Sequence, residues 1–293
     1  MKNRKKNLFC FGTGYSAKVI AKLLLNDGEP NEWRVYGSYR RNEQAKALSN
    51  IGIIPIKFNN VTNILKNADV ILSSIPPTED GDPVLDQYGG LLSRMGKKPW
   101  IGYFSTTGVY GNTKGKLVDE TAPLNPTSER SRRRTLAEKN WLEYAAHIFR
   151  LPGIYGPGRS SLDRLRNGLS KRIDYPNHLF SRIHVDDIAQ SIVASINKPN
   201  PNSIYNICDD EAAEQQLVEA YASKLLGIEA PPLVPFKQAI KEMSPMAQTF
   251  WQDNRQVSNV KIKNELGINL LYPTFREGLK AIYQISECIN KTV

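Results

Sequence analysis

The chain has 293 residues, of which 40% are hydrophobic and 23% are charged, and its formal net charge is +10. These proportions are those of an ordinary globular protein, so disorder of the whole chain is not expected. No run of about 18 apolar residues occurs, which argues against a transmembrane helix and a membrane partner.

The first half of the chain alternates short apolar runs with amphipathic stretches. Strands are expected at 8–11, 33–39, 53–58, 69–75, 100–105 and 147–151, with 203–208 returning to the sheet edge, and helices at 17–25, 43–48 and 128–146. Strands alternating with helices predict βαβ units and a parallel sheet. The predicted fold class is α/β, a Rossmann-type doubly wound parallel sheet with a smaller C-terminal substrate-side lobe.

The alternation also suggests how the chain is divided. Residues 1–156, with 182–226 returning to them, are assigned to the Rossmann domain. Residues 157–181 and 227–293 do not fit the alternation, and we assign them to the smaller lobe. The basic start, residues 1–7, is expected to be a solvated arm, because the apolar run behind it is too short for a signal peptide. We therefore expect a cytoplasmic protein.

The cysteines and histidines give no metal-binding pattern. They are far apart and show no ligand spacing: Cys10, Cys208, Cys288, His147, His178 and His184. We expect free thiols and no metal site. The positive charge favours anionic partners, although solubility alone explains it equally well. Basic residues do not interleave with aromatic ones, and no helix-turn-helix or zinc-finger pattern occurs, so nucleic-acid binding is not expected.

A glycine-rich turn follows the first expected strand and opens the first expected helix. Its pattern, G-x-G-x-x-A, runs from Gly12 through Gly14, Tyr15 and Ser16 to Ala17. The first glycine permits the tight turn, the second lets a pyrophosphate approach, and the small third residue allows close packing. The helix N-terminus offers free N–H groups to phosphates. This context predicts a dinucleotide site; the alternative is a purely structural turn.

The end of the second strand indicates which dinucleotide binds. Enzymes that use NAD usually place a carboxylate there for the ribose hydroxyls. Here Ser38 is followed by Arg40 and Arg41, and no carboxylate is present. Because guanidinium groups bind phosphate in bidentate geometry, the sequence favours NADP, with NAD possible. The alternative is that the arginines form a solvated loop.

Several strings together resemble the extended short-chain dehydrogenase/reductases, in the NAD(P)-dependent epimerase/dehydratase family. The strings are FSTTGVYG at 104–111, DE at 119–120 with Pro123 and Pro126, RLPGIYGPG at 150–158, RIHVDDIA at 182–189 and YNI at 205–207, with a tail pattern from 255 to 279 typical of an atypical subgroup. The resemblance covers nearly the whole chain. It specifies fold and cofactor but not substrate.

The resemblance also implies roles for individual residues. Thr106 matches the active-site Ser/Thr of the family, and Thr107 is its neighbour. The cofactor would be flanked by residues after the fourth and sixth strands: Ile75, Pro76, Pro152, Gly153 and Ile154.

The sequence departs from the family at its catalytic Tyr-x-x-x-Lys pair. Aligned on Glu138, Arg130 stands at the Tyr position and Arg134 at the Lys position. Arginine stays protonated and cannot act as a general acid or base. Either both arginines face the cleft and bind an anion, or this part of the helix is only a solvated face. A proton carrier would then lie elsewhere, with four candidates: Tyr110, Tyr155, Asp119 and Glu120.

Two functions follow as hypotheses. The first is an NADP-dependent oxidoreductase or epimerase-like enzyme acting on a small, anionic, hydroxyl- or carbonyl-bearing substrate such as a nucleotide sugar. The second is an NADP(H)-binding sensor or regulatory protein that has lost catalysis, which the missing Tyr and Lys favour. The sequence leaves the oligomeric state open between monomer and homodimer.

Overall fold

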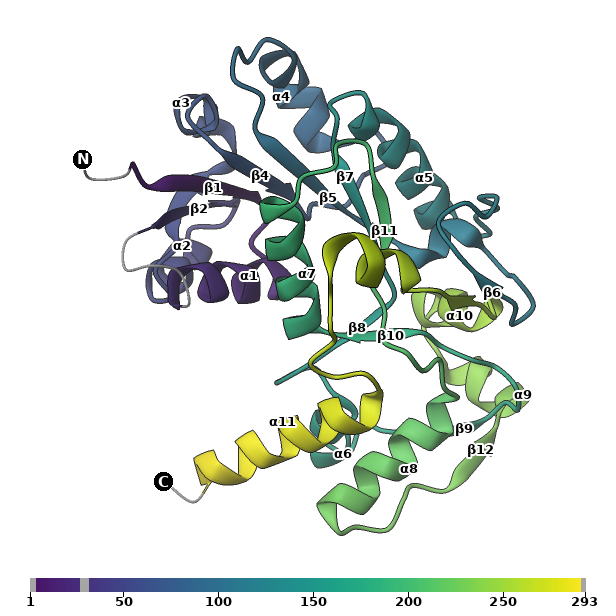
Figure 1. The fold of residues 1–293 in the computed structure, drawn as a ribbon. Coiled ribbons are helices and arrows are strands. Elements are labelled where there is room, and N and C mark those ends of the chain that lie inside the picture. The colour runs from purple at the N-terminus through teal and green to yellow at the C-terminus, as the bar shows by residue number, and fades with distance from the viewer. Residues whose placement is uncertain (1–3, 27–31, 291–293) are drawn as a thin grey trace.

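The structure, a computed structural model, describes residues 4–26 and 32–290 (Figure 1). Its strands are β1 (Lys6–Phe11), β2 (Trp33–Tyr39), β3 (Ile54–Lys57), β4 (Val70–Ser73), β5 (Trp100–Thr106), β6 (Leu117–Val118), β7 (His147–Leu151), β8 (Gly153–Tyr155), β9 (Arg172–Asp174), β10 (Arg182–His184), β11 (Ile204–Asn206), β12 (Leu233–Pro235) and β13 (Gln256–Val257). Its α-helices are α1 (Tyr15–Asn26), α2 (Glu43–Ser49), α3 (Thr62–Leu65), α4 (Pro83–Ser93), α5 (Glu129–Leu142), α6 (Ser161–Arg166), α7 (Val185–Asn197), α8 (Gln215–Leu226), α9 (Phe236–Ala239), α10 (Pro245–Gln252) and α11 (Phe275–Asn290).

Seven parallel strands form the central sheet in the order β11-β7-β5-β4-β1-β2-β3. β1 pairs with β2 on one side and with β4 on the other, so the strand order reverses direction here. In open α/β sheets, such a switch point leaves a crevice beyond the carboxyl ends of the strands. The predicted doubly wound parallel sheet is confirmed, including the return of 204–206 to the edge beside β7.

Helices cover both faces of this sheet because each buries one apolar stripe. On one face, α1 packs with α7 and contributes Ile20 and Leu24, which are four positions apart. On the other face, α5 contributes Ala137 and Trp141 at the same spacing, beside α3 and α4. The N-terminus of α1 consequently opens at the crevice.

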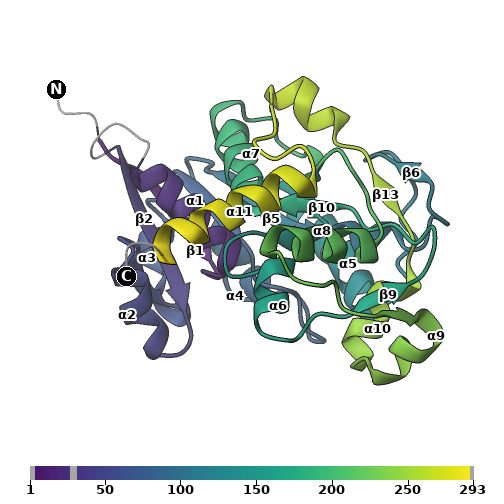
Figure 2. The ribbon, with the colours of Figure 1, turned by 90° about the horizontal axis from the view of Figure 1, so that it is seen from below.

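A second, smaller cluster of helices lies below the sheet in Figure 1, and Figure 2 shows it from beneath. α6, α8 and α11 pack together around Leu162, Val218, Phe275 and Leu279. The ring of Tyr155 at the end of β8 joins this cluster and lies against Gly278, where an added Cβ would come within 2.2 Å of its hydroxyl. This close packing ties α11 to the strand that leaves the main sheet.

Two segments pack against a different part of the molecule from the one to which the sequence assigned them. α8, in the stretch assigned to the Rossmann domain, packs against α6 and α11 of the lower cluster, because its apolar face (Val218, Ala222) completes that core. Conversely, three apolar residues of the tail join the main core beside α7: Ile262, Leu266 and Ile268. Helix α4 was not predicted, although Asp82 caps it and Pro83 opens it.

Three further observations concern the sequence expectations. Residues 1–3 of the basic arm lie outside the described residues, whereas the pair Arg4–Asp69 at 2.6 Å fastens the following segment. Over 4–26 and 32–290, no helix has the combined length and apolar character needed to cross a membrane. In those same ranges, no group of three or more His, Cys, Asp or Glu side chains is arranged to hold a metal ion.

Candidate functional site

A cleft of about 520 Å³ lies between the carboxyl edge of the sheet and the lower cluster. One wall consists of the glycine turn, the end of β5, the segment after β7 and the start of α5. The opposite wall comes from 179–182 and from 250–255. Many predicted site residues line it: Gly14, Tyr15, Ser16, Ala17, Thr106, Thr107, Arg130, Arg134, Pro152, Gly153 and Ile154.

The glycine turn has the shape that its sequence predicts. Gly12 has φ of +77°, and an added Cβ would come within 2.9 Å of Ile75 and Ser74, so a side chain here meets both strain and a clash. At Gly14, by contrast, no atom lies within 4 Å of an added Cβ. The turn is therefore tight at its first glycine and open at its second, as the approach of a pyrophosphate requires. The first-turn amides of α1 have no intrahelical acceptor, so they are free to donate to a phosphate.

Ser38 supports the glycine turn instead of facing the cleft. Its buried hydroxyl accepts a hydrogen bond from the Gly12 amide at 2.9 Å. Arg40 and Arg41 follow on an exposed turn, where both amides donate to Gln44 Oε1. The Arg40 guanidinium lies 5.1 Å from the centre of the Phe58 ring. The two arginines thus lie at the β2 end of the crevice, outside the main cleft.

Arg40 lines a separate hollow between the end of β3 and α4. Its neighbours there include Lys57, Phe58 and Asn59. Lys57, a residue the sequence argument did not consider, adds a second cation at the place where a ribose phosphate is expected. Of the two predicted residues after β4, Ile75 supports Gly12, while Pro76 is exposed.

Thr106 ends β5 at the floor of the cleft. Its Oγ1 accepts a hydrogen bond from the Gly108 amide at 3.1 Å, which fixes the hydroxyl at the start of the 3₁₀ turn 107–110. Thr107 is buried beside it. Gly108 allows α5 to come close, because an added Cβ would lie 2.6 Å from Ser131 Oγ. The start of α5 is therefore pressed against the threonine pair.

Of the four arginines of α5, Arg130 and Arg134 reach the cleft, and they differ in burial and in partners. Arg134 is buried and donates to the Phe104 carbonyl and, at 3.0 Å, to Tyr103 Oη. Arg130 stays exposed, with its guanidinium 5.7 Å from the centre of the Phe250 ring across the cleft. Partial burial and the charge of Arg134 lower the pKa of Arg130 from its ordinary value. These contacts favour the cleft-facing interpretation over a solvated helix face.

Tyr110 does not line this cleft. It is buried behind β5, where its hydroxyl donates to Asn206 Oδ1 and accepts from Arg150, both at 2.8 Å. Arg150 in turn pairs with Glu138 at 2.7 Å, and both side chains are only 2% exposed. Burial raises the pKa of Tyr110. The structure therefore gives Tyr110 a supporting position, without access to a bound substrate.

The phenol that does line the cleft is also occupied. Tyr15 Oη donates to the Pro157 carbonyl at 3.0 Å, and burial, followed by the charge of Asp186, raises its pKa to about 12. Among the described residues that line the cleft, Tyr15 is the one tyrosine. This tyrosine begins α1, and no tyrosine of the set stands on α5.

The far wall combines aromatic rings with arginines. Phe180 and Trp251 meet edge to face at 4.9 Å, and Trp251 also stacks on His178 at 5.6 Å. Arg182 donates to the carbonyls of Phe180 and Ala213, and burial lowers its pKa to about 10. Such a wall offers flat faces to a ring and positive charge to an anion.

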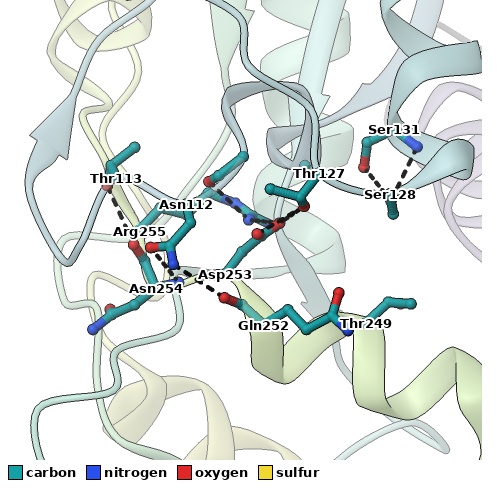
Figure 3. A network of polar contacts seen from close by, with 12 residues as sticks. Asn112, Thr113, Thr127, Ser128, Ser131, Thr249, Gln252, Asp253, Asn254 and Arg255 are labelled. Carbon is teal, nitrogen blue, oxygen red and sulfur yellow. Dashed lines mark hydrogen bonds and ion pairs between the residues drawn. The ribbon is translucent and has the colours of Figure 1, made fainter.

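A polar network holds the segment 252–255 against the loop that follows the 3₁₀ turn (Figure 3). Asp253 accepts from Thr127 Oγ1 at 2.8 Å and from Arg255 at 2.7 Å. Asn112 donates to the Gln252 carbonyl at 3.2 Å and accepts from the Asn254 amide at 3.3 Å. The network fixes the end of α10, and with it Trp251, beside the entrance to the cleft.

No protein-family model and no curated protein matches the chain. Solved structures do. A functionally unknown conserved protein from Silicibacter pomeroyi DSS is 41% identical, covering 97% of this chain and 100% of that one, with a TM-score of 0.89. The chain belongs to the same family as this protein.

More distant structures show the same fold. The dTDP-glucose 4,6-dehydratase of Bacillus anthracis, in complex with NAD, is 20% identical, covers 98% of each chain and has a TM-score of 0.74. The UDP-glucuronic acid 4-epimerase of Bacillus cereus, in complex with UDP-glucuronic acid and NAD, is 16% identical over 97% of this chain and 99% of that one, with a TM-score of 0.75. The dehydratase and the epimerase thus share the fold of this chain, as the resemblance stated above implies.

Most of the far wall belongs to the segments expected in the smaller lobe, but none of its residues was predicted as a site residue. Arg182 and Arg255 stand inside the strings that carry the resemblance, but neither string assigns them a role. Phe250 and Trp251 belong to a segment without a recognisable motif, and only the fold brings them to the cleft. The cluster of cations in a chain of net charge +10 was the one available signal.

Proposed function

We propose that the protein binds NADP(H), or NAD(H), along the glycine turn and acts as an oxidoreductase or epimerase-like enzyme on a small anionic substrate such as a nucleotide sugar. The observation that supports it most is the open cradle at Gly14, beside the free amides of α1 and continuous with the cleft. Bound there, the dinucleotide would supply a hydride acceptor or donor.

The residues of the chain would take four parts in this function. Gly14 admits the pyrophosphate, and Arg40 with Arg41 and Lys57 attracts the 2′-phosphate. Thr106 orients a substrate hydroxyl or carbonyl through its fixed hydroxyl. The aromatic far wall accepts a base or a sugar ring.

Calorimetric titration with NADPH and NADH tests the cofactor assignment. We expect wild type to prefer NADPH, and Arg40→Ala/Arg41→Ala to lose that preference while still binding NADH. Gly14→Val should weaken both dinucleotides more than tenfold, because the branched side chain fills the cradle, yet leave the melting temperature unchanged in the empty space around it. The control Arg34→Ala/Lys66→Ala removes the same charge from exposed positions at the amino edge of the sheet.

Binding of neither dinucleotide by wild type would contradict the proposal. If a dinucleotide does bind, turnover is tested by incubating the loaded protein with nucleotide sugars. The products are identified by NMR, since an epimerase consumes no net cofactor.

One observation favours a second candidate, a dinucleotide-binding sensor without catalysis. Tyr15, the tyrosine that lines the cleft, is hydrogen-bonded to the Pro157 carbonyl, and the alignment on Glu138 implies that Arg130 occupies the position of the family's proton-carrying tyrosine. This candidate expects no turnover and a set of captured partner proteins that changes with NADPH. Identical partner sets with and without NADPH would reject it.

A further inference from the structure

The lining of the cleft is strongly cationic. Its charged side chains are five arginines and one carboxylate: Arg130, Arg134, Arg159, Arg182, Arg255 and Asp253. A concave site lined by one sign of charge focuses its field on the ligand. The excess of positive charge therefore calls for an anion inside the cleft.

The arginines differ in how far the protein already satisfies them. Arg134 and Arg182 donate to backbone carbonyls, and Arg255 is paired with Asp253. Arg130 makes no hydrogen bond or ion pair with any residue in the described part of the chain; its guanidinium lies over the Phe250 ring and is exposed to the positive charge of Arg134. A guanidinium left in this state beside Arg134 is stabilised when a negative charge joins it.

The position of Arg130 indicates where in the cleft the missing negative charge would lie relative to Thr106. Arg130 lines the same cleft as Thr106, and its neighbour Ser131 comes against Gly108, two residues after Thr106. In the proposed function, Thr106 marks the hydroxyl or carbonyl that reacts. An anion on Arg130 would then lie next to the reacting carbon, away from any diphosphate farther along the substrate.

We propose that Arg130 binds a carboxylate carried by the substrate close to its reacting carbon, so that the substrate is a sugar acid or a similar hydroxy- or keto-acid derivative. The inference rests on the proposed function and specifies its substrate class. One unpaired guanidinium balances one charge, which suits a carboxylate better than a doubly charged phosphate. The guanidinium fork also matches the two carboxylate oxygens.

In this proposal Arg130 acts differently from the tyrosine that the resemblance would place at its position. It remains protonated and moves no proton. It orients the substrate and excludes analogues that lack the acid, because these leave its charge without a partner. Phe250, whose ring lies over Arg130, would cover the pair from the side of α10.

The test compares two probes that differ only at the acid group. UDP-glucuronic acid and UDP-glucose are titrated calorimetrically into the protein loaded with NAD(P). We expect wild type to bind the acid at least tenfold more tightly. Arg130→Gln should bind both probes equally, and Arg130→Lys should keep part of the preference. Arg132→Gln is the matched control, since Arg132 is on the same helix but pairs with Glu129 at 3.0 Å and lies outside the cleft.

The possible results separate the two proposals. Equal binding of both probes by wild type overturns the carboxylate inference and leaves the nucleotide-sugar proposal standing. Binding of neither probe to a protein that holds its dinucleotide overturns both. If Arg130→Gln still binds UDP-glucuronic acid more tightly than UDP-glucose, another residue binds the carboxylate. That result also overturns the assignment of the carboxylate to Arg130. Because Arg130 bonds to no described residue, its variants should keep the wild-type circular dichroism spectrum.

Discussion

The buried pair of Glu138 and Arg150 connects α5 to β7 directly behind the cleft. Arg150 reaches both Glu138 oxygens with its guanidinium and also holds Tyr110. Burial works against the charge on Arg150, but the hydrogen bonds and charge of Glu138 outweigh it and raise the Arg150 pKa. Ser105, the residue before Thr106, donates to the same carboxylate. The position of Thr106 thus depends on an ion pair whose two residues do not line the cleft.

Replacing one partner of this ion pair should lower the free energy of unfolding more than replacing both partners. We expect Glu138→Gln to lower the free energy of unfolding by about 3 kcal/mol, since it leaves Arg150 buried without a counter-charge. Glu138→Met/Arg150→Met should lose less, because no charge stays behind. Urea denaturation measures both. Glu129→Gln, at an exposed ion pair of the same helix, should leave the unfolding midpoint unchanged; an equal loss in both single variants would contradict the argument.

At the level of single residues, the sequence predicted what local chemistry determines. Gly12 and Gly14 follow from the turn that a dinucleotide requires, and the structure gives each the expected space. Ser38 was expected near a phosphate, yet it holds the turn, because a buried hydroxyl takes the nearest free amide. Whether Ser38 bonds to the Gly12 amide or faces the cleft depends on how β1 packs against β2, which the sequence alone does not reveal.

Whole elements follow from patterns of a few residues. β2 and β7 begin and end at the predicted residues: Glu32 and Arg40 flank β2, and Pro152 follows the last residue of β7. α5 ends at Leu142, four residues before the expected end, and Ala145 then takes a positive φ of 57°. No helix is expected from the sequence at α7, because its N-cap residue, His184, belongs to a string recognised by resemblance alone.

The cap of α7 makes the stability of the protein depend on pH. His184 Nδ1 accepts the Asp186 amide at 3.2 Å, and burial lowers the His184 pKa to about 4. Protonation would remove this acceptor. An unfolded histidine titrates near 6.5, so the unfolded chain takes up the proton first. The stability that the lowered pKa of His184 contributes is therefore fully present above about pH 6.5 and is lost as the pH falls toward 4.

We expect this histidine to account for about 2 kcal/mol of unfolding free energy lost between pH 7 and pH 4.5. His184→Asn keeps a capping side chain but cannot titrate. Urea denaturation at both pH values should therefore show a smaller loss in the variant. A loss equal to that of wild type would mean that other groups carry the acid sensitivity.

On the scale of the whole molecule, the cleft is formed by segments far apart in the sequence. The glycine turn and the end of β5 could be placed from the sequence because both stand at carboxyl ends of parallel strands. The far wall could not, because residues 179–182 and 250–255 meet only in the folded chain, where the Leu179 amide donates to Asn254 Oδ1 and the Phe180 ring packs against Trp251. Predicting such a meeting requires the path of the whole tail, which local patterns do not specify.

The two walls also differ in how firmly they are held. β5 is buried along almost its whole length, whereas α10 has no buried residue, and Met246 and Phe250 are exposed. Segments with few buried contacts open at a lower free energy than core strands. α10 is therefore the part of the cleft that a ligand can stabilise most, through Phe250 and Trp251.

Hydrogen exchange followed by mass spectrometry should show this difference. In the free protein, we expect amides of 245–252 to exchange much faster than those of 100–106. Dinucleotide alone should slow exchange at the glycine turn, and dinucleotide with UDP-glucuronic acid should slow it in α10 as well, since only the substrate spans both walls. Exchange in α10 as slow as in β5 before any ligand is added would mean that the far wall is already rigid, and the cleft would then select its substrate by shape alone.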